Sequence, residues 1–203
     1  MAKSLIIVES PAKTKTIKGF LGSNYAVEAS MGHVRDLPPS KLGVDVEKNF
    51  ALSYEPLKDR KDVLGKLAAA AKGADTIYLA SDPDREGEAI AWHLVDQLGL
   101  KKYHRISYTQ ITEAAIRRAI ESPGRIDLAL VQAQRARQCL DKLVGFEVSP
   151  LLWNSTGGKS AGRVQSATLH LVCERERERL AFQPEEYWTL RSIYGQGFEA
   201  LYD

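Results

Sequence analysis

The feature that most constrains the fold is a run of carboxylates directly after an apolar segment. The apolar residues 76–80, Thr-Ile-Tyr-Leu-Ala, have the composition of a buried strand, and residues 89–98 beyond the run have helical spacing. The pattern therefore predicts a strand, an acidic turn and a helix. Ligands of open α/β sheets bind outside the carboxyl ends of the strands, so these acids lie where a functional site is expected.

Three of these acids, Asp82, Asp84 and Glu86, can converge on one small volume, and Pro83 stiffens the turn between the first two. Residues 82–88 hold four acids against one arginine, a net charge of −3 that is costly unless a cation relieves the repulsion. Oxygen ligands without a nearby cysteine favour Mg²⁺, or Mn²⁺, over Zn²⁺, and Mg²⁺ usually takes only one or two protein carboxylates.

A purely structural role for the same acids stays open at this point. Ser81 or Asp82 would then be the N-cap of the following helix, and the helix dipole would favour Glu86 and Glu88 in its first turn.

Composition describes a globular chain of 203 residues, 44% hydrophobic and 27% charged, long enough for one large domain or one and a half ordinary ones. The net charge of +2 hides basic regions at residues 1–18 and 101–142, on either side of the acidic centre. This arrangement suggests a polyanion held over a metal. Cys139 and Cys173 lack the spacing of a zinc site or a disulfide framework, and no apolar run has the length of a signal peptide or membrane span. We therefore expect a cytoplasmic protein.

The N-terminal residues repeat the strand, turn and helix pattern. Residues 4–8 read as a buried parallel strand, and Pro11 is placed to open a helix that runs to about residue 21. Glu9 then ends a strand as Asp82 does, so neighbouring parallel strands would bring the two close. Lys13, one helical turn beyond Glu9, can meet a phosphate at the helix N-terminus, although it can also be a solvated lysine.

The middle of the chain continues this alternation and predicts a small parallel sheet with helices on both faces. Residues 31–39 form a predicted loop whose His33 and Arg35 offer donors for phosphate or base, and residues 40–59 are predicted to be irregular. The remaining expected elements are strands at 25–30 and 105–108, a helix at 63–71, and a helix capped by Thr112.

After residue 122 the pattern is helical. We expect a helix over 127–146, an interruption at Pro150, a Gly-rich turn at 154–159 and a helix over 162–181. Strands are expected at 187–194 and from 198 onward. Residues 174–179 alternate Glu and Arg and read as a solvated helix face.

Four segments together resemble the bacterial type IA DNA topoisomerases: residues 7–13, 32–38, 82–92 and 160–166. A Glu with a distant Asp-x-Asp marks the Toprim domain in general, which primases and some nucleases share. The Asp-Arg-Glu-Gly-Glu and Ser-Ala-Gly-Arg-Val-Gln-Ser segments are narrower signatures. The resemblance spans nearly the whole chain. It implies an α/β Toprim domain over residues 1–121, the first part of a helical DNA-groove domain over 122–186, and the start of a β-containing domain at 187–203 that is cut short.

In this family a tyrosine attacks one strand of negatively supercoiled DNA, forms a 5′-phosphotyrosyl link, and the strand is resealed with Mg²⁺, without ATP, after strand passage. The resemblance makes Asp82, Asp84 and Glu86 the acidic triad. Glu9 becomes the acid/base beside the leaving 3′ oxygen and a further metal ligand, and Lys13 the cation on the scissile phosphate. It also implies a monomer that acts on single-stranded segments of nucleoid DNA.

The resemblance places a row of DNA contacts along the helix at 127–146. Arg137, Gln138 and Lys142 match DNA-facing positions, and Asp141 is expected to orient Arg137. Further contacts match His33, Ser160, Ala161, Gly162, Arg163, Val164 and Gln165.

Two departures from the family pattern stand out. The family has two arginines where this chain has Arg137 and Gln138. None of the eight tyrosines lies in the Met-Arg-Thr-Asp-Ser type of context that carries the nucleophile, so the chain is expected to bind Mg²⁺ and single-stranded DNA but not to act alone.

Two alternatives stay in view. An isolated Toprim nuclease or nucleic-acid-binding module would use metal-bound water and leave free ends. The topoisomerase part of reverse gyrase is disfavoured because the chain starts directly at the first Toprim strand.

Overall fold

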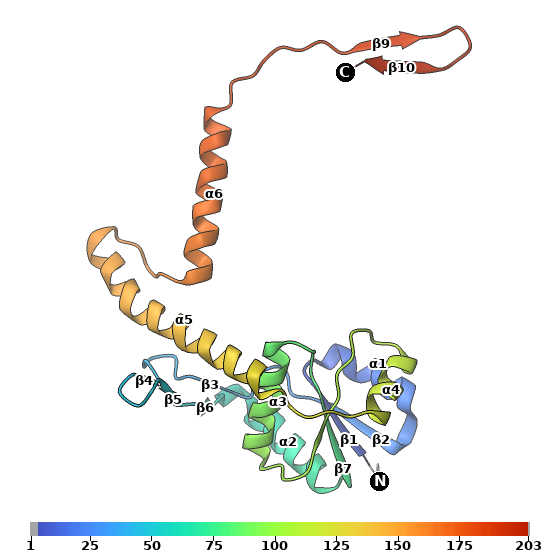
Figure 1. The fold of residues 1–203 in the computed structure, drawn as a ribbon, viewed down its shortest axis with the longest axis vertical. Helices are drawn as coiled ribbons and strands as arrows, with labels where there is room; N and C mark the ends of the chain where they lie inside the picture. The colour runs from blue at the N-terminus through green and yellow to red at the C-terminus, as the bar shows by residue number, and fades with distance from the viewer. Residues whose placement is uncertain (1–3, 203) are drawn as a thin grey trace. The chain divides into compact units, whose positions relative to one another are not determined.

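The computed structural model describes residues 4–202 and divides the chain into two compact units that meet between Ala161 and Gly162 (Figure 1). Each unit is described by itself. No helix among the described residues combines the length and the apolar character that crossing a membrane requires.

A four-stranded parallel sheet lies at the centre of the first unit. Its strand order is β2-β1-β7-β8, and β1 pairs with β7 in the register Ser4↔Thr76 to Val8↔Ala80. Because the pairing is parallel and in step, the carboxyl ends of β1 and β7 lie side by side. The four strands are β1 (Ser4–Val8), β2 (Tyr25–Ala29), β7 (Thr76–Ala80) and β8 (His104–Arg105).

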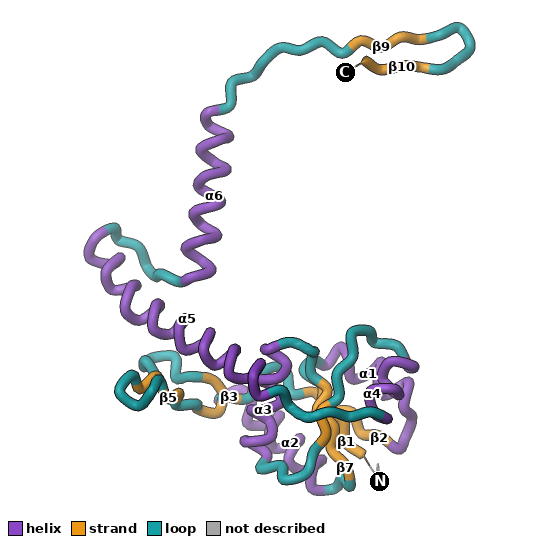
Figure 2. Tube along the Cα trace, viewed as in Figure 1, coloured by secondary structure: helices purple, strands orange, loops and turns teal. Residues whose placement is uncertain are grey.

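Helices cover both faces of this sheet, as the sequence predicts (Figures 1 and 2). Alternate residues of β1 point to opposite faces: Leu5 and Ile7 join one apolar core, and Ile6 and Val8 join the other. The first core packs against α2 (Lys61–Lys72) and α3 (Arg85–Leu98), and the second against α1 (Pro11–Leu21) and α4 (Glu113–Glu121). The predicted small parallel sheet with helices on both faces is therefore confirmed.

The segment between β2 and α2 is more regular than the sequence suggests. Residues expected to be loop and irregular chain form two antiparallel pairs, β3 with β6 and β4 with β5. Two residues per strand are too few to show an alternating pattern, which is why the sequence did not reveal them. The elements are β3 (Arg35–Asp36), β4 (Val44–Asp45), β5 (Ala51–Leu52), β6 (Glu55–Pro56) and two single turns of 3-10 helix at Gly22–Asn24 and Lys58–Arg60.

Helix α5 (Leu128–Ser155) corrects the expected interruption at Pro150, since the helix runs through the proline. A proline inside a helix removes one backbone hydrogen bond and costs about 3 kcal/mol or more. The preceding Ser149 is buried, and its hydroxyl accepts a hydrogen bond from the Ala161 backbone N–H at 3.0 Å. This contact ties the helix next to the proline to the segment that follows it, and sequence periodicity does not reveal it.

The second unit holds one helix and one hairpin. Helix α6 (Arg163–Ala181) begins after Gly162 as expected, and its Arg–Glu pairs at i,i+3 are exposed. Strands β9 (Leu190–Ile193) and β10 (Glu199–Tyr202) pair antiparallel. Strand β9 begins three residues later than the predicted strand at 187–194.

Candidate metal and nucleic-acid site

The ends of β1 and β7 bring an acidic pair together around one lysine. Glu9 follows β1 and Asp82 follows β7 by two residues. Lys13 Nζ, in the first turn of α1, donates to Glu9 Oε1 at 2.7 Å and to Asp82 Oδ1 at 2.5 Å. The Lys13 side chain is only 15% exposed, so α1 presents a largely shielded ammonium between two carboxylates.

The pKa shifts of Lys13 and Asp82 favour the charged form of both groups. Burial alone would lower the pKa of Lys13, but hydrogen bonds and charge interactions with Asp82 and Glu9 raise it above its usual value. Burial would likewise raise the pKa of Asp82, and the hydrogen bonds with Lys13 and Glu9 outweigh it and lower that pKa. The site therefore holds a fixed positive charge among acids.

Asp84 is the N-cap of α3. Its Oδ1 accepts a hydrogen bond from the Gly87 N–H at 2.7 Å, so the capping role exists but belongs to neither Ser81 nor Asp82. The acidic turn folds back closely on the helix: a Cβ at Gly87 would lie 2.1 Å from the Asp82 carbonyl oxygen. Only glycine fits there, and the Gly87 backbone thereby fixes the path of the chain at Asp82.

Glu86 faces the loop that follows β2. The Ser30 N–H donates to the Val8 carbonyl and the Gly32 N–H to the Glu9 carbonyl, both at 2.8 Å, so the chain after β2 lies along the end of β1. This places His33 Nε2 2.5 Å from Glu86 Oε1. His33 therefore lies at the same edge of the sheet as the acids.

The donor chemistry fits a hard divalent cation, although the acids are not gathered as expected. Among residues 4–202, no three His, Cys, Asp or Glu side chains lie close enough together to hold a metal. Asp82, Asp84 and Glu86 are each hydrogen-bonded to a different neighbour. Mg²⁺ needs only one or two carboxylates, and the Asp82 side chain is 45% exposed beside the exposed Asp84.

Glu88, the last acid of the run, has a separate role that the sequence does not reveal. It is 5% exposed and forms a buried ion pair with Arg105, which is 3% exposed, at 2.8 Å. Arg105 Nη2 also donates to the Asp82 carbonyl at 2.8 Å, and Glu88 Oε2 accepts from the Asp127 N–H at 2.9 Å. The pair thus connects the acidic turn to the start of α5. In the sequence Glu88 is one more carboxylate of the run, so only its depth in the core identifies the role.

A second cluster surrounds Arg35, which was expected to offer a donor to phosphate or base but is buried. The Arg35 guanidinium lies 5.0 Å from the Tyr54 ring centroid and 4.8 Å from that of Trp92, and it also pairs with Asp96. Arg35 Nε donates to His93 Nδ1 at 2.5 Å. Burial, reinforced by nearby positive charge, lowers the pKa of His93 to about 3, so this imidazole stays neutral and accepts a hydrogen bond from Arg35.

The predicted DNA contacts on α5 divide into two groups. Arg137 is 41% exposed and pairs with Asp141 at 3.7 Å, the partner expected from the one-turn spacing. Gln138 and Lys142 instead fasten α5 to the segment after His33. Gln138 Nε2 donates to Asp36 Oδ1 at 2.5 Å, and Lys142 Nζ donates to the Pro38 carbonyl at 2.6 Å.

The predicted contacts at residues 160–165 span the division between the units. Ser160 and Ala161 end the first unit. Gly162 is the N-cap of α6, and Arg163, Val164 and Gln165 form its first turn.

Comparison with known proteins agrees with this architecture. Residues 4–113 match the Toprim domain family, and residues 125–201 match the DNA topoisomerase family. The chain is similar to the solved structure of full-length topoisomerase I from Thermotoga maritima, with 48% identity and a TM-score of 0.78 over 98% of this chain. It spans 34% of the length of that protein. The chain belongs to the bacterial type IA DNA topoisomerase family.

Proposed function

We propose that this chain supplies the magnesium-binding and acid–base part of a type IA topoisomerase site and binds single-stranded DNA beside it. The observation that supports this most is Lys13 between Glu9 and Asp82 at two adjacent strand ends. A shielded ammonium next to a general acid/base suits a reaction at a phosphodiester, in which charge develops on phosphate oxygens and a proton must reach the leaving oxygen.

In this proposal the residues divide the work. Asp82 and Asp84 hold Mg²⁺, which when bound neutralises charge on the phosphate. Glu9 exchanges the proton of the 3′ oxygen, Lys13 contacts the scissile phosphate, and Glu86 orients His33 at the rim. Because the DNA topoisomerase family matches residues 125–201 as well, we favour this role over that of an isolated Toprim nuclease.

The attacking tyrosine is not assigned to this chain. Among the described residues, Tyr108 is the tyrosine whose pKa responds to Glu9, Lys13 and Asp82, but burial raises that pKa, and its hydroxyl lies 3.4 Å from the Ala80 carbonyl. A neutral, buried phenol is a poor nucleophile. We propose that relaxation needs a tyrosine outside these 203 residues, and that the whole enzyme acts without ATP as a cytoplasmic monomer on nucleoid DNA.

Oligonucleotide binding across a salt series tests the proposal. Each phosphate neutralised on a single strand contributes roughly −0.7 to the log–log slope of affinity against salt, and weak binding on the order of 10⁻⁴ to 10⁻⁶ M is expected. Arg137→Ala should weaken binding and remove nearly one such contact from the slope. The matched control is Arg177→Ala, because Arg177 is an exposed arginine paired with Glu174 on α6. Equal weakening by the two substitutions would exclude α5 as the DNA surface.

A further inference from the structure

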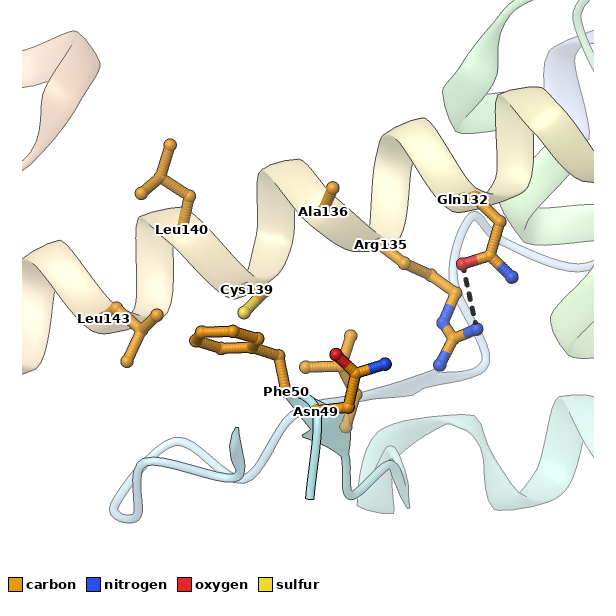
Figure 3. Close-up of a pocket in the computed structure, with 9 residues that line it drawn as sticks. Asn49, Phe50, Gln132, Arg135, Ala136, Cys139, Leu140 and Leu143 are labelled. Atoms are coloured by element: carbon orange, nitrogen blue, oxygen red, sulfur yellow. Dashed lines mark hydrogen bonds between the residues drawn. The ribbon is translucent and has the colours of Figure 1, made fainter. Parts of the chain in front are cut away.

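A groove between the β4–β5 hairpin and α5 lies apart from the Mg²⁺ site (Figure 3). Its volume of about 470 Å³ falls within the range of small-molecule pockets, roughly 300–1,000 Å³. The hairpin contributes Asn49, Phe50 and Leu52. The helix contributes Gln132, Arg135, Ala136, Cys139, Leu140 and Leu143.

The hairpin is fixed to the helix, so the groove is part of the fold. Val44 and Leu37 are buried against Cys139, and Leu52 packs on the same cluster. Close by, the Tyr54 hydroxyl donates to Gln138 Oε1 at 3.0 Å. Both walls are therefore held in place.

The hairpin tip adopts a strained backbone that carries an aromatic ring into the groove. Asn49 has φ 51° and Phe50 has φ 57°, both in the left-handed region. This is tolerable for Asn but a genuine outlier for a bulky residue such as Phe, and strain of this kind clusters at functional sites. Figure 3 shows the Phe50 ring below Cys139, and the residue is 49% exposed. One side of the ring is thus packed while much of it stays accessible.

The opposite end of the groove is polar. Arg135 Nη1 donates to Gln132 Oε1 at 3.2 Å, and its guanidinium lies 5.3 Å from the Trp92 ring centroid, which fixes its position. Arg135 Nε is buried without a hydrogen-bond partner among the described residues. The Asn49 amide lies between the two ends (Figure 3). The residues that line the groove include one cation and no carboxylate.

We infer that this groove binds one unpaired base of single-stranded DNA. A base offers a flat face for the Phe50 ring and a hydrogen-bonding edge for the amides of Asn49 and Gln132, while Arg135 attracts the adjoining phosphate. The single cation and the absence of carboxylates in the lining favour an anionic ligand such as a nucleic acid over a basic or neutral peptide. The inference rests on the proposed function in taking single-stranded DNA as the ligand. It adds a contact to the base, whereas Arg137 would contact the backbone.

Fluorescence anisotropy with two labelled oligomers of equal length, an oligothymidylate and its abasic counterpart, tests the inference in the 203-residue chain. Phe50→Ala should weaken binding of the oligothymidylate roughly 5- to 150-fold, the range of one base–aromatic stack, and leave binding of the abasic oligomer unchanged. Phe50→Tyr keeps the ring and should bind as the wild type does. Val46→Ala, at an exposed residue of the same hairpin that does not line the groove, is the matched control. If Phe50→Ala melts early, Phe50→Leu removes the ring while keeping apolar contact, with the same expected result.

The outcomes separate this inference from the proposed function. Two results would overturn the base site alone and favour a protein segment as the ligand of the groove. In the first, Phe50→Ala weakens binding of both oligomers equally. In the second, Phe50→Ala weakens binding of neither, while Arg137→Ala still weakens binding. A wild-type chain that binds neither oligomer would overturn the proposed function together with the inference.

Discussion

Replacing Glu88 by Ala should destabilise the first unit far more than replacing any acid of the candidate metal site. The Glu88 carboxylate is 5% exposed and accepts from Arg105 Nε at 2.8 Å and from the Asp127 N–H at 2.9 Å. Its loss leaves the Arg105 guanidinium 3% exposed, with backbone carbonyls as its remaining hydrogen-bond partners among the described residues.

The magnitude follows from the burial of the pair. Removing one partner of a buried ion pair typically costs about 3–5 kcal/mol, because the remaining charge is uncompensated. At roughly 2–4 °C per kcal/mol for a domain of this size, the melting temperature should fall by about 6–20 °C. Glu88→Gln keeps an acceptor oxygen for Arg105 and should cost less.

Urea unfolding followed by far-UV circular dichroism measures the effect, and Glu86→Ala is the matched control. Glu86 lies two residues earlier in α3, is 50% exposed and pairs with His33, so its loss should cost less than about 1 kcal/mol. Equal losses for Glu88→Ala and Glu86→Ala would refute the assignment of Glu88 to the core and of Glu86 to the site.

Three further predictions concern the surroundings of the site. The pKa of His93 is about 3 in the folded chain against an ordinary 6.5, so the unfolded chain binds more protons between these values. The stabilisation that depends on a neutral His93 is fully present above pH 6.5, and the free energy of unfolding falls by up to about 1.4 kcal/mol per pH unit below it. His93→Asn keeps an acceptor for Arg35, so the stability of this variant, measured by urea unfolding, should depend less on pH. An unchanged slope would contradict a neutral His93. Gly87→Ala places a methyl group on the Asp82 backbone and should reduce the thermal stabilisation by Mg²⁺. Gly65→Ala, where a Cβ meets nothing within 4 Å, should leave that stabilisation intact. Equal increases in melting temperature with Mg²⁺ for the two variants would show that Gly87 does not set the turn. The chain alone should not relax a supercoiled plasmid with Mg²⁺, and a denaturation-resistant protein–DNA band would show that a tyrosine within it can attack.

The sequence predicted those parts of the fold that depend on local pattern. Residues 5–8 and Ile77, Leu79 and Ala80 are apolar and buried, as expected for strands covered on both faces, and this pattern placed Glu9 and Asp82 at adjacent strand ends. Helix starts at Pro11 and Thr112 followed from the cap and first-turn chemistry of these residues.

Contacts between distant segments could not be predicted in this way. Glu88 looks like its acidic neighbours in the sequence, and only its ion pair with the distant Arg105 sets it apart. Pro150 looks like a helix break in the sequence, although α5 runs through it. The groove depends on Phe50 in a left-handed conformation, and no periodicity indicates such a backbone. The roles assigned to the acids depend on a cation, which local pattern alone does not place.

Calorimetric titration with Mg²⁺ tests whether Asp82 and Asp84 hold the metal. The variant Asp82→Asn with Asp84→Asn removes both charges while keeping hydrogen-bonding side chains, and Asn is a good N-cap for α3. Asp62→Asn, at an exposed acid in the first turn of α2, is the control. The wild type and the control should bind Mg²⁺, and the double variant should not. Undiminished binding by the double variant would show that the metal is held elsewhere.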